Sequence, residues 1–95
     1  MAGKVEIRNV NQPGKVGRVD AAKYAAMRDA MVAALTGSDP LTTAQIKAAV
    51  LPRLPDDLFP GGETAGWWVK CVQLDLEARG EMQRHDTKPL TFSLA

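Results

Sequence analysis

Cysteine and histidine each occur only once in this sequence, as Cys71 and His85. A single cysteine cannot form an internal disulfide, which favours a reducing, cytoplasmic setting. One cysteine and one histidine also give no spacing typical of a metal site, so we predict no bound metal and no other cofactor. Cys71 lies among apolar residues with no histidine near it in the sequence, which is typical of an inert buried thiol. We therefore predict a protein that is not an enzyme.

Long apolar runs are also missing. No stretch approaches the roughly 18 residues that cross a membrane, and the first residues contain no apolar segment typical of a secretion signal. The chain has 95 residues, of which 45% are apolar and 24% charged. These values are typical of one small folded domain with a single core.

An excess of charge of either sign is absent as well, because the formal net charge is +1. The charges are nevertheless unevenly distributed. Basic residues outnumber Glu6 in the segment 1–19, at Lys4, Arg8, Lys15 and Arg18. Acidic residues outnumber basic ones in and just after the segment 62–80, at Glu63, Asp75, Glu77 and Glu81. The first segment is therefore the more favourable one for contact with phosphates.

The first predicted helix follows Asp20, whose carboxylate can accept from the free N–H groups of the next turn. Apolar residues then recur at three- and four-residue spacing, and Gly37 is placed to end the helix. The second predicted helix follows Thr42, which forms a capping-box pattern with Gln45. Pro52 should stop or kink that helix, because its ring removes a backbone hydrogen bond.

The third predicted helix occupies the stretch between Gly62 and Gly80, with Gly80 as its C-terminal stop. Strand patterns lie on both sides of the helices. The segment 4–10 alternates polar and apolar residues, which predicts a short N-terminal strand, with a loose arm as the alternative. Residues 82–84 and 90–94 flank a turn and predict a C-terminal hairpin, and a very short strand is expected at Leu41.

Three helices followed by a hairpin predict an α+β winged-helix fold, with the hairpin as the wing and an extra N-terminal strand. We expect residues 1–19 to form the arm or strand and residues 20–95 the winged-helix domain. The run 74–84 resembles the junction between helix and wing in many bacterial winged-helix regulators. The whole chain resembles a small bacterial family of uncharacterised winged-helix-like proteins, through the segments 9–14, 18–21 with Lys23 and Tyr24, 58–62, and 66–68. That resemblance implies the fold and no activity.

The third helix has two apolar sides. One face should pack on the first two helices, through Ala65, Trp68, Val69, Val72 and Leu76. A second apolar edge consists of Trp67, Cys71 and Leu74. A helix that is apolar on two sides is normally covered on both. The N-terminal strand, the wing or a second copy of the chain are the candidates to cover this edge, unless it is only the wing-facing half of the core.

Two functions follow from this interpretation. In the first, the protein binds double-stranded DNA. The third helix would enter the major groove with Thr64, Lys70 and Gln73, and phosphates would be contacted by Arg84 and Lys88 of the wing and by Arg18. In the second, Trp67, Cys71 and Leu74 form an interface with another protein or a second copy, since tryptophan is enriched at interface centres. The precedent of the fold favours the first function, and the apolar edge favours the second.

Overall fold

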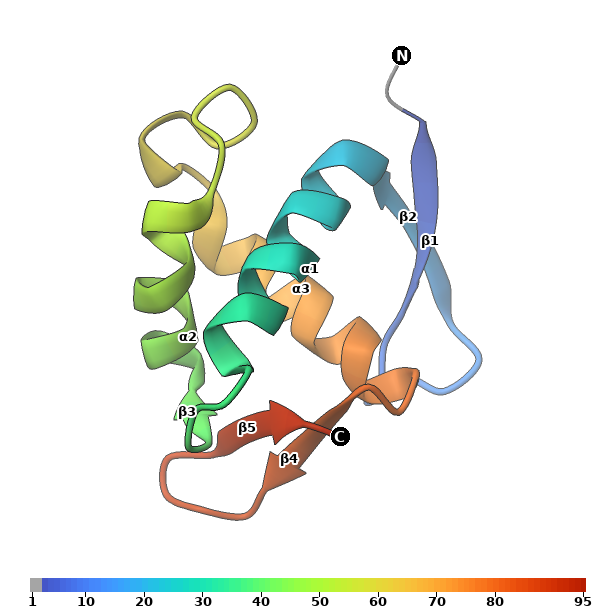
Figure 1. Cartoon of the computed structure of the whole chain (residues 1–95). Coiled ribbons are helices and arrows are strands. Elements are labelled where there is room, and N and C mark those ends of the chain that lie inside the picture. The colour runs from blue at the N-terminus through green and yellow to red at the C-terminus, as the bar shows by residue number, and fades with distance from the viewer. Residues whose placement is uncertain (1–2) are drawn as a thin grey trace.

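The computed structural model describes residues 3–95 and has an α+β architecture, as predicted (Figure 1). The described residues form three helices and two small antiparallel sheets. The helices are α1 (Ala21–Leu35), α2 (Thr43–Val50) and α3 (Ala65–Ala78), and the strands are β1 (Lys4–Arg8), β2 (Val16–Asp20), β3 (Leu41–Thr42), β4 (Met82–His85) and β5 (Thr91–Leu94). Two 3-10 turns, Leu51–Arg53 and Pro60–Gly62, lie between α2 and α3.

The two sheets lie on different sides of the helices. One is the hairpin β1–β2, in which Ile7 lies opposite Gly17. The other has the strand order β3-β5-β4, with Leu41 opposite Phe92. The predicted N-terminal strand, the short strand at Leu41 and the C-terminal hairpin are therefore all present. Strand β2 was not predicted, because Gly17 and Arg18 interrupt its apolar alternation.

Local capping explains where the first two helices begin. The Asp20 carboxylate accepts a hydrogen bond from the Lys23 N–H at 2.9 Å. Thr42 and Gln45 form the complete capping box, with hydrogen bonds of 3.1 and 2.9 Å in the two directions. Each contact satisfies a backbone donor that the first turn of a helix leaves unpaired. Helix α2 ends at Val50, just before the predicted stop at Pro52.

Helix α3 is continuous, but it begins at Ala65 and not directly after Gly62. Gly61, Gly62 and Thr64 all have positive φ angles, so the chain turns sharply before the helix starts. At the other end, Gly80 has φ 75°. Its N–H donates to the Glu77 carbonyl at 3.1 Å, and the Glu81 N–H donates to the Leu76 carbonyl at 2.9 Å. This is a Schellman pattern, and it confirms Gly80 as the predicted C-terminal stop.

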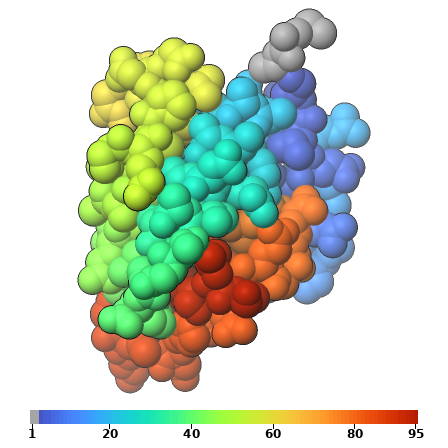
Figure 2. Space-filling view, in the orientation of Figure 1, coloured from blue at the N-terminus to red at the C-terminus, as the bar shows by residue number. Residues whose placement is uncertain are grey.

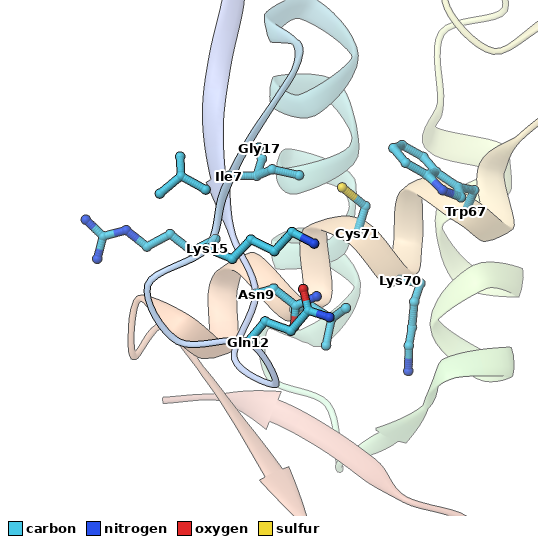
Figure 3. Close-up of a pocket in the computed structure, with 11 residues that line it drawn as sticks. Ile7, Asn9, Gln12, Lys15, Gly17, Trp67, Lys70 and Cys71 are labelled. Carbon is cyan, nitrogen blue, oxygen red and sulfur yellow. The ribbon is translucent and has the colours of Figure 1, made fainter.

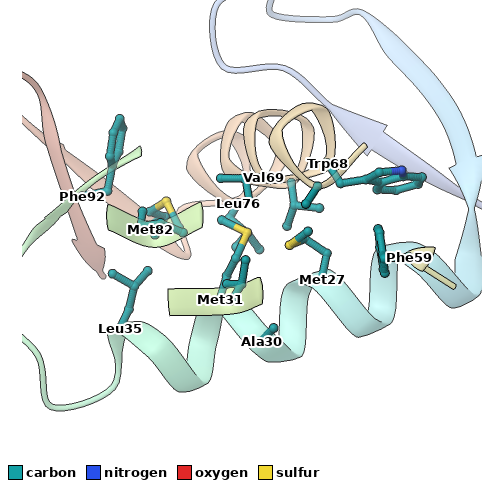
Figure 4. Packing of buried hydrophobic residues seen from close by; sticks show 14 of the residues in the cluster. Met27, Ala30, Met31, Leu35, Phe59, Trp68, Val69, Leu76, Met82 and Phe92 are labelled. Carbon is teal, nitrogen blue, oxygen red and sulfur yellow. The ribbon is translucent and has the colours of Figure 1, made fainter. Parts of the chain in front are cut away.

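The hydrophobic core lies between α1, α2 and α3 and extends to Met82 and Phe92 of the second sheet (Figure 4). The face of α3 predicted to be buried is buried at each of its five positions. Phe59, from the irregular segment before α3, packs edge-on against Trp68 with 6.2 Å between ring centroids. In the space-filling view, α1 lies across the front of the molecule between α2 and the first hairpin (Figure 2). Helix α3 is thus held from the α1 and α2 side, and its other side faces β1.

Replacing Gly66, within α3, and Gly80, just after its C-terminus, by alanine should change the stability of the protein in opposite directions. Gly80→Ala should destabilise the protein by about 1 kcal/mol, because a Cβ at positive φ is strained even where nothing lies near it. Gly66→Ala should stabilise it by about 0.5–1 kcal/mol, because Gly66 is helical and its added Cβ would meet only the flexible Lys47 side chain. Urea unfolding of both variants measures the difference. Equal effects of the same sign would contradict the proposed C-terminal cap.

Candidate binding groove between the first hairpin and helix α3

A buried carboxylate fixes the first hairpin to α3. Asp75 is completely buried. Its oxygens accept hydrogen bonds from the Arg8 backbone N–H at 2.7 Å, from the Tyr24 hydroxyl, and from Arg79 Nε at 3.0 Å. Arg79 also donates to the Glu6 carbonyl at 3.0 Å. A buried charge is tolerated when it is paired and hydrogen-bonded in this way. Asp75 therefore joins β1, α1 and α3 at one point.

The surroundings of Asp75 change the acidity of its partners. Burial, and then the hydrogen bond to Asp75, raises the pKa of Tyr24 from 10.0 to about 12. The hydrogen bond to Asp75 also raises the pKa of Arg79. At neutral pH the tyrosine is therefore a neutral donor and the arginine a cation, and the shifts extend these states to higher pH. The cluster holds β1, α1 and α3 together.

Beside this attachment point, the hairpin and α3 enclose an open groove of about 340 Å³ (Figure 3). The N–H of Val10 donates to the Leu74 carbonyl at 3.3 Å and holds the start of the β1–β2 turn on the helix. The lining comes from both elements: Ile7, Arg8, Asn9, Gln12, Lys15, Val16 and Gly17 from the hairpin, and Trp67, Lys70, Cys71 and Leu74 from α3.

The apolar edge predicted on the third helix lies in this groove. Trp67 is 59% exposed, whereas Cys71 and Leu74 are half-buried. The N-terminal strand covers the edge in part, which was one of the three predicted covers. Trp67 touches its neighbour Trp68 edge to face, with 5.1 Å between ring centroids. The three residues predicted as an interface are therefore brought together, and the largest of them is still in contact with solvent.

A family model matches residues 4–92, which is almost the whole chain, and describes a family of unknown function, DUF6958. The chain belongs to DUF6958. A comparison with curated proteins finds no match, and a comparison with solved structures finds none either.

Five of the six nucleic-acid candidates in the DUF6958 chain are exposed, but the structure does not bring them together. Thr64 precedes α3, and Lys70 lies on its outer side in the groove. Arg18 lies on β2, and Lys88 lies in the β4–β5 turn. In Figure 1 that turn and the β1–β2 hairpin stand on different sides of the molecule. These cations do not form one continuous patch.

The other two candidates are engaged within the chain. The prediction that Gln73 lies on the outer face of the third helix is wrong. Its side chain is completely buried, and its Oε1 accepts a hydrogen bond from Thr43 at 3.1 Å. Arg84 makes a two-point contact with Glu77, at 2.9 and 3.0 Å. This contact raises the pKa of Arg84 and largely neutralises its charge.

Cys71 was predicted to be buried, but it is half-buried and lines the groove. Burial, and then the nearby charge of Asp75, raises the pKa of its thiol from 9.0 to about 11. The thiolate is the nucleophilic form, so this shift lowers the nucleophilic fraction at neutral pH. Within residues 3–95, no three His, Cys, Asp or Glu side chains gather at a position that could hold a metal ion. None of the helices described is both long and apolar enough to cross a membrane.

Sequence reasoning missed the Asp75 cluster and the groove itself. Asp75 and Arg79 have the i,i+4 spacing of a helical ion pair, which is a usable signal. Their position in the interior is not evident from the sequence, where Asp75 is one of several charges on the third helix. The groove needs β2 as its second wall, so it could not be predicted without that strand.

Replacing Tyr24 by Phe tests the Asp75 cluster. The variant should be less stable at neutral pH by about 1.5–3 kcal/mol, because a hydrogen bond to a charged group is lost. It should also change the alkaline behaviour. The folded pKa of Tyr24 is raised, so the stability that the phenol contributes is present below pH 10 and is lost as pH rises towards 12.

Both measurements are best made by urea unfolding in a Cys71→Ala background, since the raised thiol pKa gives a similar loss between pH 9 and 11. In that background, the decline above pH 10 should be clearly shallower in the Tyr24→Phe variant than in the protein that retains the phenol. Identical declines in the two proteins would show that the phenol is not held in a protonated state by folding.

Proposed function

We propose that this DUF6958 chain is a winged-helix module. Helices α1, α2 and α3 are followed by the β4–β5 hairpin, and the short strand β3 between α1 and α2 pairs with β5. This order of elements is typical of winged-helix domains. The β1–β2 hairpin is an addition to it. A fold of this kind does not by itself specify a function, so the function is argued from the groove.

We propose further that the module binds a protein through the groove and catalyses no reaction. The observation that carries this proposal is the exposure of Trp67, which is 59% accessible on the wall of a groove that also contains Cys71 and Leu74. Exposed apolar patches with a polar rim are typical of interaction sites, and tryptophan is prominent among residues that dominate binding energy. Covering the remainder of this indole contributes about 1–2 kcal/mol. The protonated Cys71 thiol supports the non-enzymatic assignment.

The first hairpin also supports protein binding over DNA reading. A helix that enters the major groove needs a free polar or basic outer face. In this chain β1 packs along that side of α3, Gln73 is buried, and Arg84 is paired with Glu77. The exposed remainder of α3 is rich in apolar surface.

Trp67→Ala should abolish most binding with little effect on folding. A library of random peptides displayed on phage would be selected against the immobilised full chain, and the recovered peptides would be compared on wild type and variant. A hot-spot loss of about 2 kcal/mol corresponds to roughly a 30-fold weaker affinity. Lys88→Ala, in the β4–β5 turn outside the groove, is the control and should bind like wild type. Peptides that bind the Trp67→Ala protein equally well would overturn the proposal.

The same variant tests association with a second copy. If the groove is a homodimer interface, sedimentation should show a wild-type dimer that Trp67→Ala converts to a monomer.

DNA binding is the second candidate, and one observation favours it. Thr64, Trp67 and Lys70 follow one another at three-residue spacing at the start of α3, and all three are exposed. Lys15 and Arg18 on the first hairpin and Lys88 on the other hairpin would add phosphate contacts. These cations are well separated, so the expected binding is weak and independent of sequence.

If DNA is bound, affinity for a short mixed-sequence duplex should fall steeply between about 50 and 200 mM salt. Lys70→Ala and Lys88→Ala should each reduce the slope of log affinity against log salt by about 0.9. Fluorescence anisotropy of a labelled duplex measures both effects. No binding at the lowest salt concentration would exclude this candidate.

A further inference from the structure

The groove contains cations and no carboxylate among the described residues that line it. Lys15 and Arg8 line it from the hairpin, and Lys70 lines it from α3. Lys15 extends from the hairpin towards α3 (Figure 3). A neighbouring cavity of about 400 Å³ shares Arg8, Asn9, Lys15 and Val16 with the groove, and its lining also has no Asp or Glu. Acidic residues are almost as numerous as basic ones in the chain as a whole, 11 against 12. The surface is thus selectively suited to an anionic occupant.

The groove and the neighbouring cavity together follow α3 from Trp67 to Ala78. At 1.5 Å per helical residue, this is a length of about 16 Å. An extended chain of about five residues has the same length. The two cavities can therefore accommodate a short extended peptide segment.

One wall of the groove is the first hairpin. Ile7 of β1 and Val16 and Gly17 of β2 line it. Gly17 leaves room on this wall, because a Cβ there would approach only Ile7, at 3.5 Å.

We infer that the groove binds an extended acidic segment of a partner protein that contains both apolar residues and Asp or Glu. The segment lies between the hairpin and α3. Its apolar side chains contact Trp67 and Leu74, and its carboxylates lie beside Lys15 and Lys70. This inference rests on the proposed protein-binding function and specifies the chemistry of the partner.

A second copy of the chain is a poor source of such a segment. Two stretches among residues 3–95 combine apolar and acidic residues, Leu74-Asp75-Leu76-Glu77 and Asp56-Asp57-Leu58-Phe59. The first lies within helix α3, and its Asp75 and Leu76 are buried. In the second, Phe59 is 1% exposed in the core, against Trp68. The use of either stretch as a ligand would require the core to open. A different protein is therefore the expected partner.

The composition of the selected peptides tests the inference directly. Peptides recovered from the random phage library on the full-length wild-type chain should be enriched in Asp and Glu together with apolar residues. The same selection on the double variant Lys15→Glu with Lys70→Glu should enrich Lys and Arg instead. Binding of acidic peptides to wild type should weaken as salt is raised, because the lysines are exposed.

A groove-filling variant tests the location. Gly17→Val should lower affinity for the selected peptides at least tenfold, since the new side chain occupies the space beside Ile7. Its backbone does not require glycine, because its φ angle is not in the left-handed region. Gly3→Val is the matched control: it places the same side chain where nothing lies within 4 Å, outside the groove. Urea unfolding of both variants verifies that they fold.

Three results would overturn the inference: selected peptides without an acidic bias, acidic peptides that bind the charge-reversed or Gly17→Val protein as tightly as wild type, or a dimer in solution that closes the groove. Peptides that need Trp67 but are not acidic would remove only the acidic partner and would leave the proposed function in place. A failure to select any Trp67-dependent peptide would remove both.

Discussion

The carboxylate of Asp75 is the point on which the arrangement of this protein depends. It is completely buried on α3, and it is hydrogen-bonded to β1, α1 and the end of its own helix. Loss of any of these partners would leave a charge or a donor unsatisfied in the interior. The contact to the Arg8 N–H matters most for the site, because it sets the distance between the first hairpin and α3. The groove lies beside the point at which Asp75 holds the hairpin on α3.

Features encoded within a few residues could be predicted from the sequence. Asp20, the Thr42–Gln45 pair and Gly80 each satisfy backbone groups of their own helix end, so their effect does not depend on the rest of the chain. Strand β2 is different. Its position is determined by pairing with β1 and by the contacts of β1 with α3. The segment around Gly17 and Arg18 carries too little alternation to indicate this by itself.

In the candidate site, too, features local to one helix could be predicted and contacts with other elements could not. Helical periodicity correctly placed Trp67, Cys71 and Leu74 on one edge of α3. Periodicity does not show how many neighbouring positions around the helix are buried. It therefore assigns Gln73 to the outer face, although Thr43 of α2 covers this residue. It also cannot show that Arg84 reaches back to Glu77. In both cases the deciding partner is in another element, and single-sequence patterns do not report such contacts.

The two adjacent tryptophans have a consequence for how the groove receives a ligand. Trp67 stands at the rim of the groove, Trp68 lies in the core, and the two indoles touch. Trp68 in turn packs against Phe59, which is also buried. The outer ring therefore rests on a ring that the core holds in place. A partner that packs on Trp67 would meet a surface that is already ordered, which lowers the conformational entropy lost on binding.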